Sequence, residues 1–164
     1  MTRKKRGQMK MSFGMIFSII LIIIFLAFAF YAIQKFLGLK DSVQVAKFAN
    51  DLQADVDRMW RGSEGSEEKE YAIPGKIGYI CFTDYKSGET GRYANFYKEL
   101  EQTFYENENL FFFPLSSVGN AYEIKHVDIE KITSEENPRC FENIKGKVSF
   151  IIKKDFGETL ATIE

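Results

Sequence analysis

The distribution of hydrophobic positions divides the chain into an apolar first part and a mixed second part. Residues 11–34 form an uncharged run of 24 residues in which nearly every position is apolar. As a helix this run would be about 36 Å long, and the hydrocarbon core of a bilayer is about 30 Å thick. A helix in a soluble core would carry a polar stripe, and this run has none. The pattern therefore predicts a transmembrane helix over residues 11–37.

A second helix, with one apolar face, is predicted directly after this run. Over residues 43–60 the apolar residues recur at spacings of three and four, with charged residues between them. The apolar positions are Val45, Phe48, Ala49, Leu52, Val56, Met59 and Trp60. The pattern leaves open whether Gly38 breaks the helix or bends it. We expect an amphipathic helix over residues 41–60 that continues from the anchor and packs on the rest of the domain.

Residues 71–164 predict an α+β domain, a small and mostly antiparallel sheet with one inserted helix. The predicted strands are residues 77–84, 109–115, 122–132, 146–156 and 159–163. The last two are expected to form a hairpin, and a phase slip near His126 is interpreted as a bulge. Residues 92–105 carry apolar side chains at helical spacing, and the polar residues 61–70 predict a flexible loop.

Charge sets the expected orientation of the anchor. Residues 1–10 contain five basic residues and no acidic one, whereas only Lys35 and Lys40 follow the apolar run closely. Because Lys and Arg beside a spanning helix stay in the cytoplasm, residues 1–10 are predicted to be a cytoplasmic tail. The protein would then be a single-pass protein of the cell membrane with its C-terminal domain outside. The reversed orientation is the alternative.

The same charges bear on partners. Residues 41–164 hold 15 of the 22 basic residues and all 23 acidic ones, a net charge of −8, which argues against nucleic acid as a partner. The expected partners are the lipid bilayer and, through the transmembrane helix, copies of the same chain or other membrane proteins.

The apolar run exceeds the roughly 7–15 residues of a cleaved signal peptide, and no small-residue cleavage site follows it. We therefore expect it to be retained as an anchor.

Two cysteines, Cys81 and Cys140, lie in the predicted outer domain. An even number of cysteines in an oxidising compartment predicts a disulfide, and two buried free thiols are the alternative. Neither cysteine belongs to a CxxC pair, which argues against a zinc site or thioredoxin-like chemistry.

The sequence contains none of the motifs that carry common catalytic chemistry. GxxxxGK[ST], GxGxxG, HExxH and GxSxG are all absent from the chain. His126 is the only histidine, and a half-exposed or packed strand residue is its simpler interpretation. Cysteine–histidine catalysis would require Cys81 or Cys140 beside it. We expect no catalytic residue, no cofactor and no metal.

The aromatic run Phe111, Phe112 and Phe113 leaves two possibilities open. Successive side chains of a strand point to opposite faces. Either both faces of this strand are covered, or one phenylalanine is exposed to a partner.

The start of the chain resembles archaeal type IV pilin-like proteins with a pre-hydrophobic, class III signal. The resemblance rests on Lys4-Lys5-Arg6-Gly7-Gln8 and the apolar run that follows. In that family a membrane peptidase cuts between such a glycine and glutamine, and the helix continues into a β-rich head. The resemblance implies a processing junction at Gly7 and Gln8.

Two positions depart from that family pattern, and the rest of the chain resembles other proteins. Lys10 lies between the junction and the apolar run, and Ser12 lies near where the family often carries an acidic residue. The remainder of the chain, for example residues 137–163, resembles small uncharacterised archaeal membrane proteins.

Three hypotheses for the function follow from these observations. The leading one is a membrane-anchored, pilin-like structural or assembly protein with an extracytoplasmic domain. The second is a permanently anchored binding domain, and the third is an enzyme of the outer surface.

Overall fold

The computed structural model describes residues 13–102, 107–117 and 121–164. The chain forms two compact units, Met1–Lys40 and Asp41–Glu164. Helix α1 (Phe13–Arg61) belongs to both units, and it runs through Gly38 without a break. The fold is α+β, as predicted, because a long apolar N-terminal helix precedes a group of short antiparallel strands.

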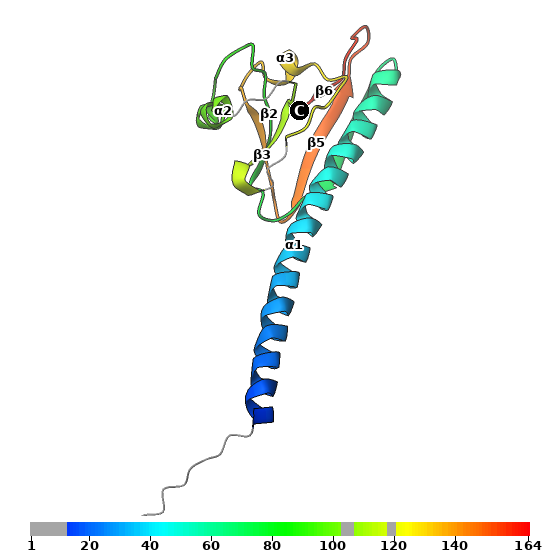
Figure 1. Cartoon of the computed structure of the whole chain (residues 1–164). Helices are drawn as coiled ribbons and strands as arrows, with labels where there is room; N and C mark the ends of the chain where they lie inside the picture. Colours follow the sequence, from blue (N-terminus) through cyan, green and yellow to red (C-terminus); the bar gives the residue numbers. More distant parts are fainter. Residues whose placement is uncertain (1–12, 103–106, 118–120) are drawn as a thin grey trace, which may run out of the picture. The chain divides into compact units, whose positions relative to one another are not determined.

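The strands form two small sheets rather than the single sheet that the sequence predicts. One sheet has the order β1 (Gly65–Ala72), β5 (Lys147–Lys154), β6 (Thr162–Ile163). The other has the order β3 (Leu110–Phe113), β2 (Tyr79–Phe82), β4 (Arg139–Glu142). The short helices are α2 (Ala94–Glu101), the 3₁₀ helix η1 (Leu115–Ser117) and α3 (Ile129–Ile132). All strand pairs in the two sheets are antiparallel, and the predicted hairpin of the last two strands is confirmed (Figure 1).

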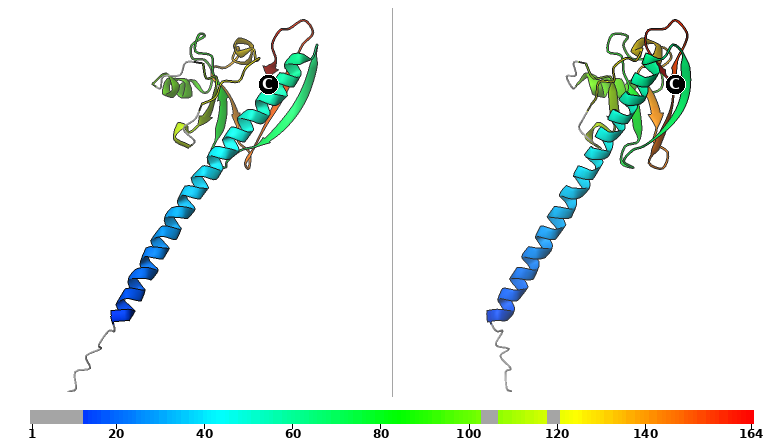
Figure 2. Two further views of the ribbon diagram at one scale, coloured as in Figure 1. Left: turned by 45° about the vertical axis from the view of Figure 1, so that its right-hand side comes forward. Right: turned by 90° about the vertical axis from the view of Figure 1, so that its right-hand side faces the viewer.

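The C-terminal part of α1 supplies one wall of the main core. Phe48, Leu52 and Val56 lie on its buried face, each at most 2% exposed. They pack against the inward side chains of β5, among them Phe150 and Ile152. Both turned views show β1 and β5 running alongside this part of α1 (Figure 2). The predicted amphipathic helix is therefore confirmed.

The β3-β2-β4 sheet is covered on both faces. Phe112 faces the main core, whereas Phe111 and Phe113 face a second apolar cluster that includes Leu100 of α2. Each of the three phenylalanines is at most 2% exposed. Of the two possibilities for this aromatic run, the structure has the one in which both faces are covered.

The prediction of a flexible loop over residues 61–70 is wrong for most of that segment. Residues 65–72 form β1, which pairs with β5 over eight residues. Glu67 and Lys69 face α1 and exchange ion pairs with Asp55 and Arg58. These tertiary ion pairs let charged side chains occupy an edge strand, where charges also discourage pairing with other chains.

The predicted strand over residues 122–132 is also wrong. Tyr122 and Val127 form only isolated bridges, and the end of the segment is α3, a short α-helix in addition to α2. The carboxylate of Asp128 caps α3 by accepting the Lys131 N–H at 3.0 Å. The bulge predicted near His126 is wrong with it, because the segment is not a strand; at that position His126 has a left-handed φ of 64°.

The other predicted elements are present with shorter bounds. The predicted strands 77–84 and 109–115 correspond to β2 and β3, and the predicted helix 92–105 corresponds to α2. Within that predicted helix, residues 103–106 lie outside the described part of the chain.

Candidate functional site

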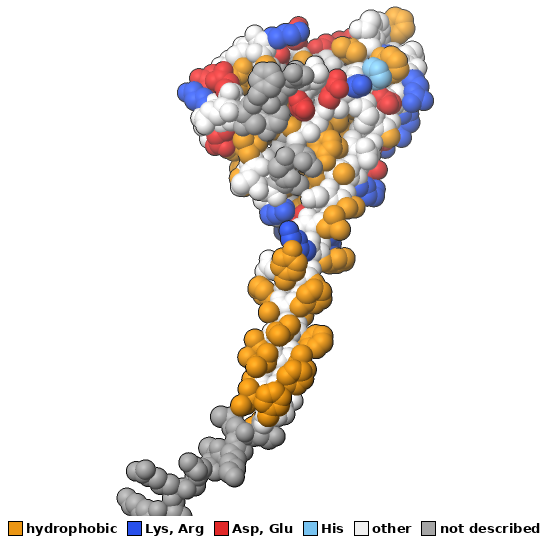
Figure 3. All heavy atoms as spheres, in the orientation of Figure 1, with side chains coloured by type: hydrophobic (Ala, Val, Ile, Leu, Met, Phe, Trp, Pro, Cys, Tyr) orange, Lys and Arg blue, Asp and Glu red, His pale blue; other side chains and the backbone are white. Residues whose placement is uncertain are grey.

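The most extensive exposed feature is the apolar part of α1. From Phe13 to Leu39 the large apolar side chains are all exposed, with Phe13 at 84% and Phe28 at 68%. The most apolar 18-residue window of this helix has a mean hydropathy of 3.0, and none of it is buried. In the described part of the chain, α1 is the one helix long and apolar enough to cross a membrane. Figure 3 shows apolar side chains along this part of the helix, in which Lys35 is the one charged residue.

The processing junction implied by the resemblance lies beyond what the structure covers. Gly7 and Gln8 are outside the described residues, which begin at Phe13. The junction therefore stays a prediction.

The structure places Cys81 and Cys140 in a disulfide across β2 and β4. The two residues are direct partners in the antiparallel pair, with their Cα atoms 4.0 Å apart. Such a short separation is typical of a pair whose backbone groups point away from each other. The backbone N–H and C=O groups of Cys140 and Glu142 therefore point to the open edge of β4. The bond also occupies both thiols that a cysteine–histidine enzyme would need.

His126 bonds to α1 and not to a cysteine. Its Nδ1 lies 2.8 Å from Oδ1 of Asp57, a distance that suits an N–H donating to the carboxylate. This hydrogen bond lowers the pKa of Asp57 below its usual range. The imidazole also stacks on the Trp60 ring, with centroids 3.8 Å apart. An aspartate–histidine pair supplies two of the three members of a hydrolytic triad, but here the imidazole is packed against a tryptophan ring.

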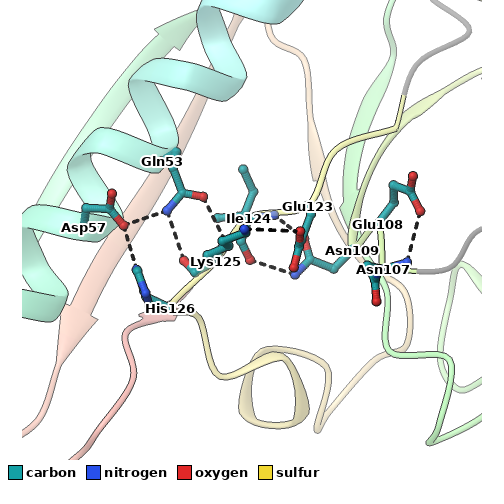
Figure 4. Close-up of polar contacts among 9 residues, drawn as sticks. All are labelled: Gln53, Asp57, Asn107, Glu108, Asn109, Glu123, Ile124, Lys125 and His126. Carbon is teal, nitrogen blue, oxygen red and sulfur yellow. Dashed lines mark hydrogen bonds and ion pairs between the residues drawn. The ribbon is translucent and has the colours of Figure 1, made fainter.

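Side-chain amides hold the segment before His126 in place. Gln53 donates to the Lys125 carbonyl at 3.2 Å and accepts its N–H at 2.8 Å. Asn109 does the same for Ile124, at 2.9 and 2.8 Å. Each side-chain amide thus forms the pair of backbone hydrogen bonds that a neighbouring strand would otherwise form. Figure 4 shows the segment between Gln53 and Asp57 on the α1 side and Asn109 on the other.

A charged cluster joins the same part of α1 to β1. Asp55 accepts a hydrogen bond from the Tyr71 hydroxyl at 2.7 Å and pairs with Arg58 at 2.8 Å. Arg58 also reaches Glu67 of β1 at 2.8 Å. Burial raises the pKa of the Tyr71 hydroxyl, and the hydrogen bond to Asp55 adds to the shift. The phenol therefore stays neutral and remains a donor to Asp55.

The end of α1 is capped by a buried lysine of β5. Lys154 is 8% exposed, and its Nζ donates to the carbonyl oxygens of Trp60 at 2.6 Å and Gly62 at 2.9 Å. A cation at this position satisfies carbonyls that have no partner within the helix, and it complements the helix dipole.

An open groove of about 680 Å³ follows the outer edge of β4. Its lining includes Cys140, Phe141 and Ile144 on one side and Lys147 and Ser149 of β5 on the other. The outward backbone groups of β4 and this mixed lining suit an extended peptide better than a compact metabolite. Among the residues that the structure describes, no three His, Cys, Asp or Glu side chains come together as metal ligands.

Sequence reasoning identified the apolar helix and the cysteine pair but missed the polar contacts of α1. Gln53, Asp57 and Lys154 have no sequence signal of their own, since each bonds to a residue more than 65 positions away. The one sequence signal in this region was the slip near His126 in the alternation of apolar and polar residues over 122–132.

No known protein family, curated protein or solved structure significantly matches the chain, and so no function is carried over from a relative.

Proposed function

We propose that this chain is a single-pass, membrane-anchored structural protein of the pilin-like kind, with its α+β domain outside the cell. The observation that carries the proposal is that one helix, α1, serves both parts of the chain. Residues 13–39 expose only apolar and uncharged side chains apart from Lys35, and residues 45–59 of the same helix form a wall of the domain core. An anchor joined by a loose tether would not share a helix with the domain that it carries.

The exposed apolar part of α1 needs an apolar environment. A soluble monomer rarely exposes apolar patches beyond a few hundred Å², and all large apolar side chains from Phe13 to Leu39 are exposed. Lipid supplies this environment before assembly, and copies of the same helix supply it within a filament. The five basic residues of the first ten favour an N-terminus in the cytoplasm.

Orientation can be tested with single cysteines in intact cells. A membrane-impermeant maleimide should label Phe156→Cys, because Phe156 is 83% exposed in the domain. The same reagent should label Lys10→Cys, which lies before the apolar run but after the proposed cut, only after the membrane is opened. The opposite result would reverse the orientation, and labelling of both in intact cells would contradict membrane crossing.

Processing at Gly7 and Gln8 can be tested by mass spectrometry of the protein extracted from membranes. In a host with a prepilin-type peptidase we expect a chain that starts at Gln8. Gly7→Leu should keep the basic tail, whereas Gly14→Leu is a matched glycine substitution within α1 and should be processed normally. A wild-type chain that starts at Met1 would exclude the cut.

Assembly is tested separately from processing. We expect the protein in filaments sheared from the cell surface, with apolar helices close enough to cross-link through Ser18→Cys. A protein that stays in the membrane fraction as single copies would contradict the structural role.

The second candidate function is a permanently anchored binding domain, and the groove along β4 favours it. In that case the helix never leaves the bilayer, and an extended segment of a partner adds to the open edge of β4. Recovery of the protein in sheared filaments would count against this candidate.

A further inference from the structure

One end of the domain Asp41–Glu164 combines an exposed apolar side chain with lysines. Ile144, in the turn between β4 and β5, is 65% exposed, and Lys145 follows it with a left-handed φ of 55°. Asn143 ties this turn to the loop before β2 by donating to the carbonyls of Pro74 at 3.1 Å and Ile77 at 2.6 Å. The exposed isoleucine therefore projects from a turn that is held in place.

The same loop contacts the beginning of the domain. Lys76 pairs with Asp41 of α1, with Nζ and Oδ2 2.9 Å apart. The Ile73 N–H donates to the Gly146 carbonyl at 2.9 Å, which joins the loop to the turn a second time. Residues 73–78 and 143–146 thus lie at the end of the domain where residue 41 lies (Figure 1).

We propose that this end of the domain, formed by residues 73–78 and 143–146, rests on the lipid surface. Ile144 enters the interface, and Lys76 and Lys145 face the phosphate groups of the lipids. The inference rests on the proposed membrane anchoring of α1, because the chain itself then brings residue 41 to the bilayer surface.

The chemistry of this end suits a lipid interface. An apolar side chain that enters the acyl boundary beside cations that reach headgroup phosphates is the pattern of interfacial membrane contacts. Of the carboxylates near it, Asp41 pairs with Lys76 and Glu70 pairs with Lys147 at 2.6 Å, whereas the ion pairs of the described residues include none of Glu142. Among the ion pairs of the described residues, none involves Lys145.

The chain offers a matched control at the other end of β5. Phe156 is 83% exposed in the turn between β5 and β6. β5 has eight residues, so at about 3.3 Å per residue the two turns are about 25 Å apart. Both positions are exposed apolar residues in turns, and only Ile144 is expected to meet lipid.

The test uses the full chain, with its disulfide intact, in vesicles of phosphatidylcholine and phosphatidylglycerol. Ile144→Cys, Phe156→Cys and Phe25→Cys each carry an environment-sensitive fluorophore, and lipids with spin-labelled acyl chains quench it. We expect strong quenching at position 25 and at least about twofold more quenching at position 144 than at position 156. Lys145→Glu should reduce the quenching at position 144.

The outcomes separate this inference from the proposed function. Equal quenching at positions 144 and 156, with position 25 strongly quenched, would overturn the lipid contact and leave the anchoring intact. Absence of quenching at position 25 would overturn the anchoring itself. If the fluorophore at position 144 reports an apolar environment only while the vesicles hold many protein copies, and reports water when they hold fewer, the occupant is a second copy of the chain. That result would overturn the inference.

Discussion

Replacing Phe48 with alanine should release α1 from the two sheets of the domain. Phe48 is 2% exposed, and its ring centroid lies 5.4 Å from that of Tyr71, 5.9 Å from Phe112 and 6.1 Å from Phe150. These three rings come from β1, β3 and β5, so Phe48 touches both sheets. Burial of a phenylalanine stabilises a fold by about 1.5–3 kcal/mol, and the remaining cavity raises the cost of truncation to about 3–5 kcal/mol.

We therefore expect Phe48→Ala to lower the free energy of unfolding by about 4 kcal/mol, out of a total of about 5–15 kcal/mol. For a domain of about 120 residues this corresponds to a fall in Tm of about 15 °C. The assay is denaturant unfolding of the full chain in detergent micelles. Fluorescence of Trp60, the single tryptophan, reports the transition because its ring stacks on His126.

The matched control is Val43→Ala on the same helix. Val43 is 59% exposed, so its truncation should change the free energy of unfolding by less than about 0.5 kcal/mol. If Phe48→Ala changed this free energy by less than about 1 kcal/mol, α1 would not be part of the core. The anchor and the domain core would then not share this helix.

Three further predictions concern the contacts that hold the domain together. Replacing Cys81 and Cys140 with serine removes a cross-link between residues 59 positions apart, and it should lower the free energy of unfolding by about 4 kcal/mol in the chain-entropy model. The measurement is the denaturant midpoint, which should fall and should no longer change when reductant is added. Lys154→Met should lower the free energy of unfolding by about 2 kcal/mol, because two carbonyls at the end of α1 lose a charged donor. The control Lys153→Met, on the opposite face of β5, should lower it by less than about 1 kcal/mol. The pKa of Asp57 is lowered in the folded state, so the stability that its carboxylate contributes is present above the unfolded pKa and is lost as the pH falls through the folded pKa. Asp57→Asn should therefore make the free energy of unfolding fall less steeply in unfolding curves recorded from pH 6 to pH 2.

The sequence predicted the helical parts of this fold well, because their signals are local. The uncharged run and the three- and four-residue spacing of Phe48, Leu52 and Val56 need no distant partner to be recognised. The even cysteine count predicted a disulfide, but it did not predict that Cys81 and Cys140 face each other on β2 and β4.

The two wrong segments depend on residues far away in the chain. β1 reads as a loop because its partner β5 lies about 80 positions later and its charges are matched only by α1. The segment around His126 alternates like a strand, yet Gln53 and Asn109 provide the hydrogen bonds that a neighbouring strand would have supplied. In both cases side chains of distant elements, which no local pattern contains, decide the structure.

The polar side chains in the last part of α1 are used for tertiary contacts with different elements. Gln53 and Asp57 hold the segment before α3, Asp55 and Arg58 hold β1, and the end of the helix is capped from β5. A helix bonded on several sides can neither rotate nor slide along its axis without breaking hydrogen bonds in a partly buried setting, and each such loss costs about 1–3 kcal/mol. The position at which the helix enters the domain is therefore fixed by the domain itself.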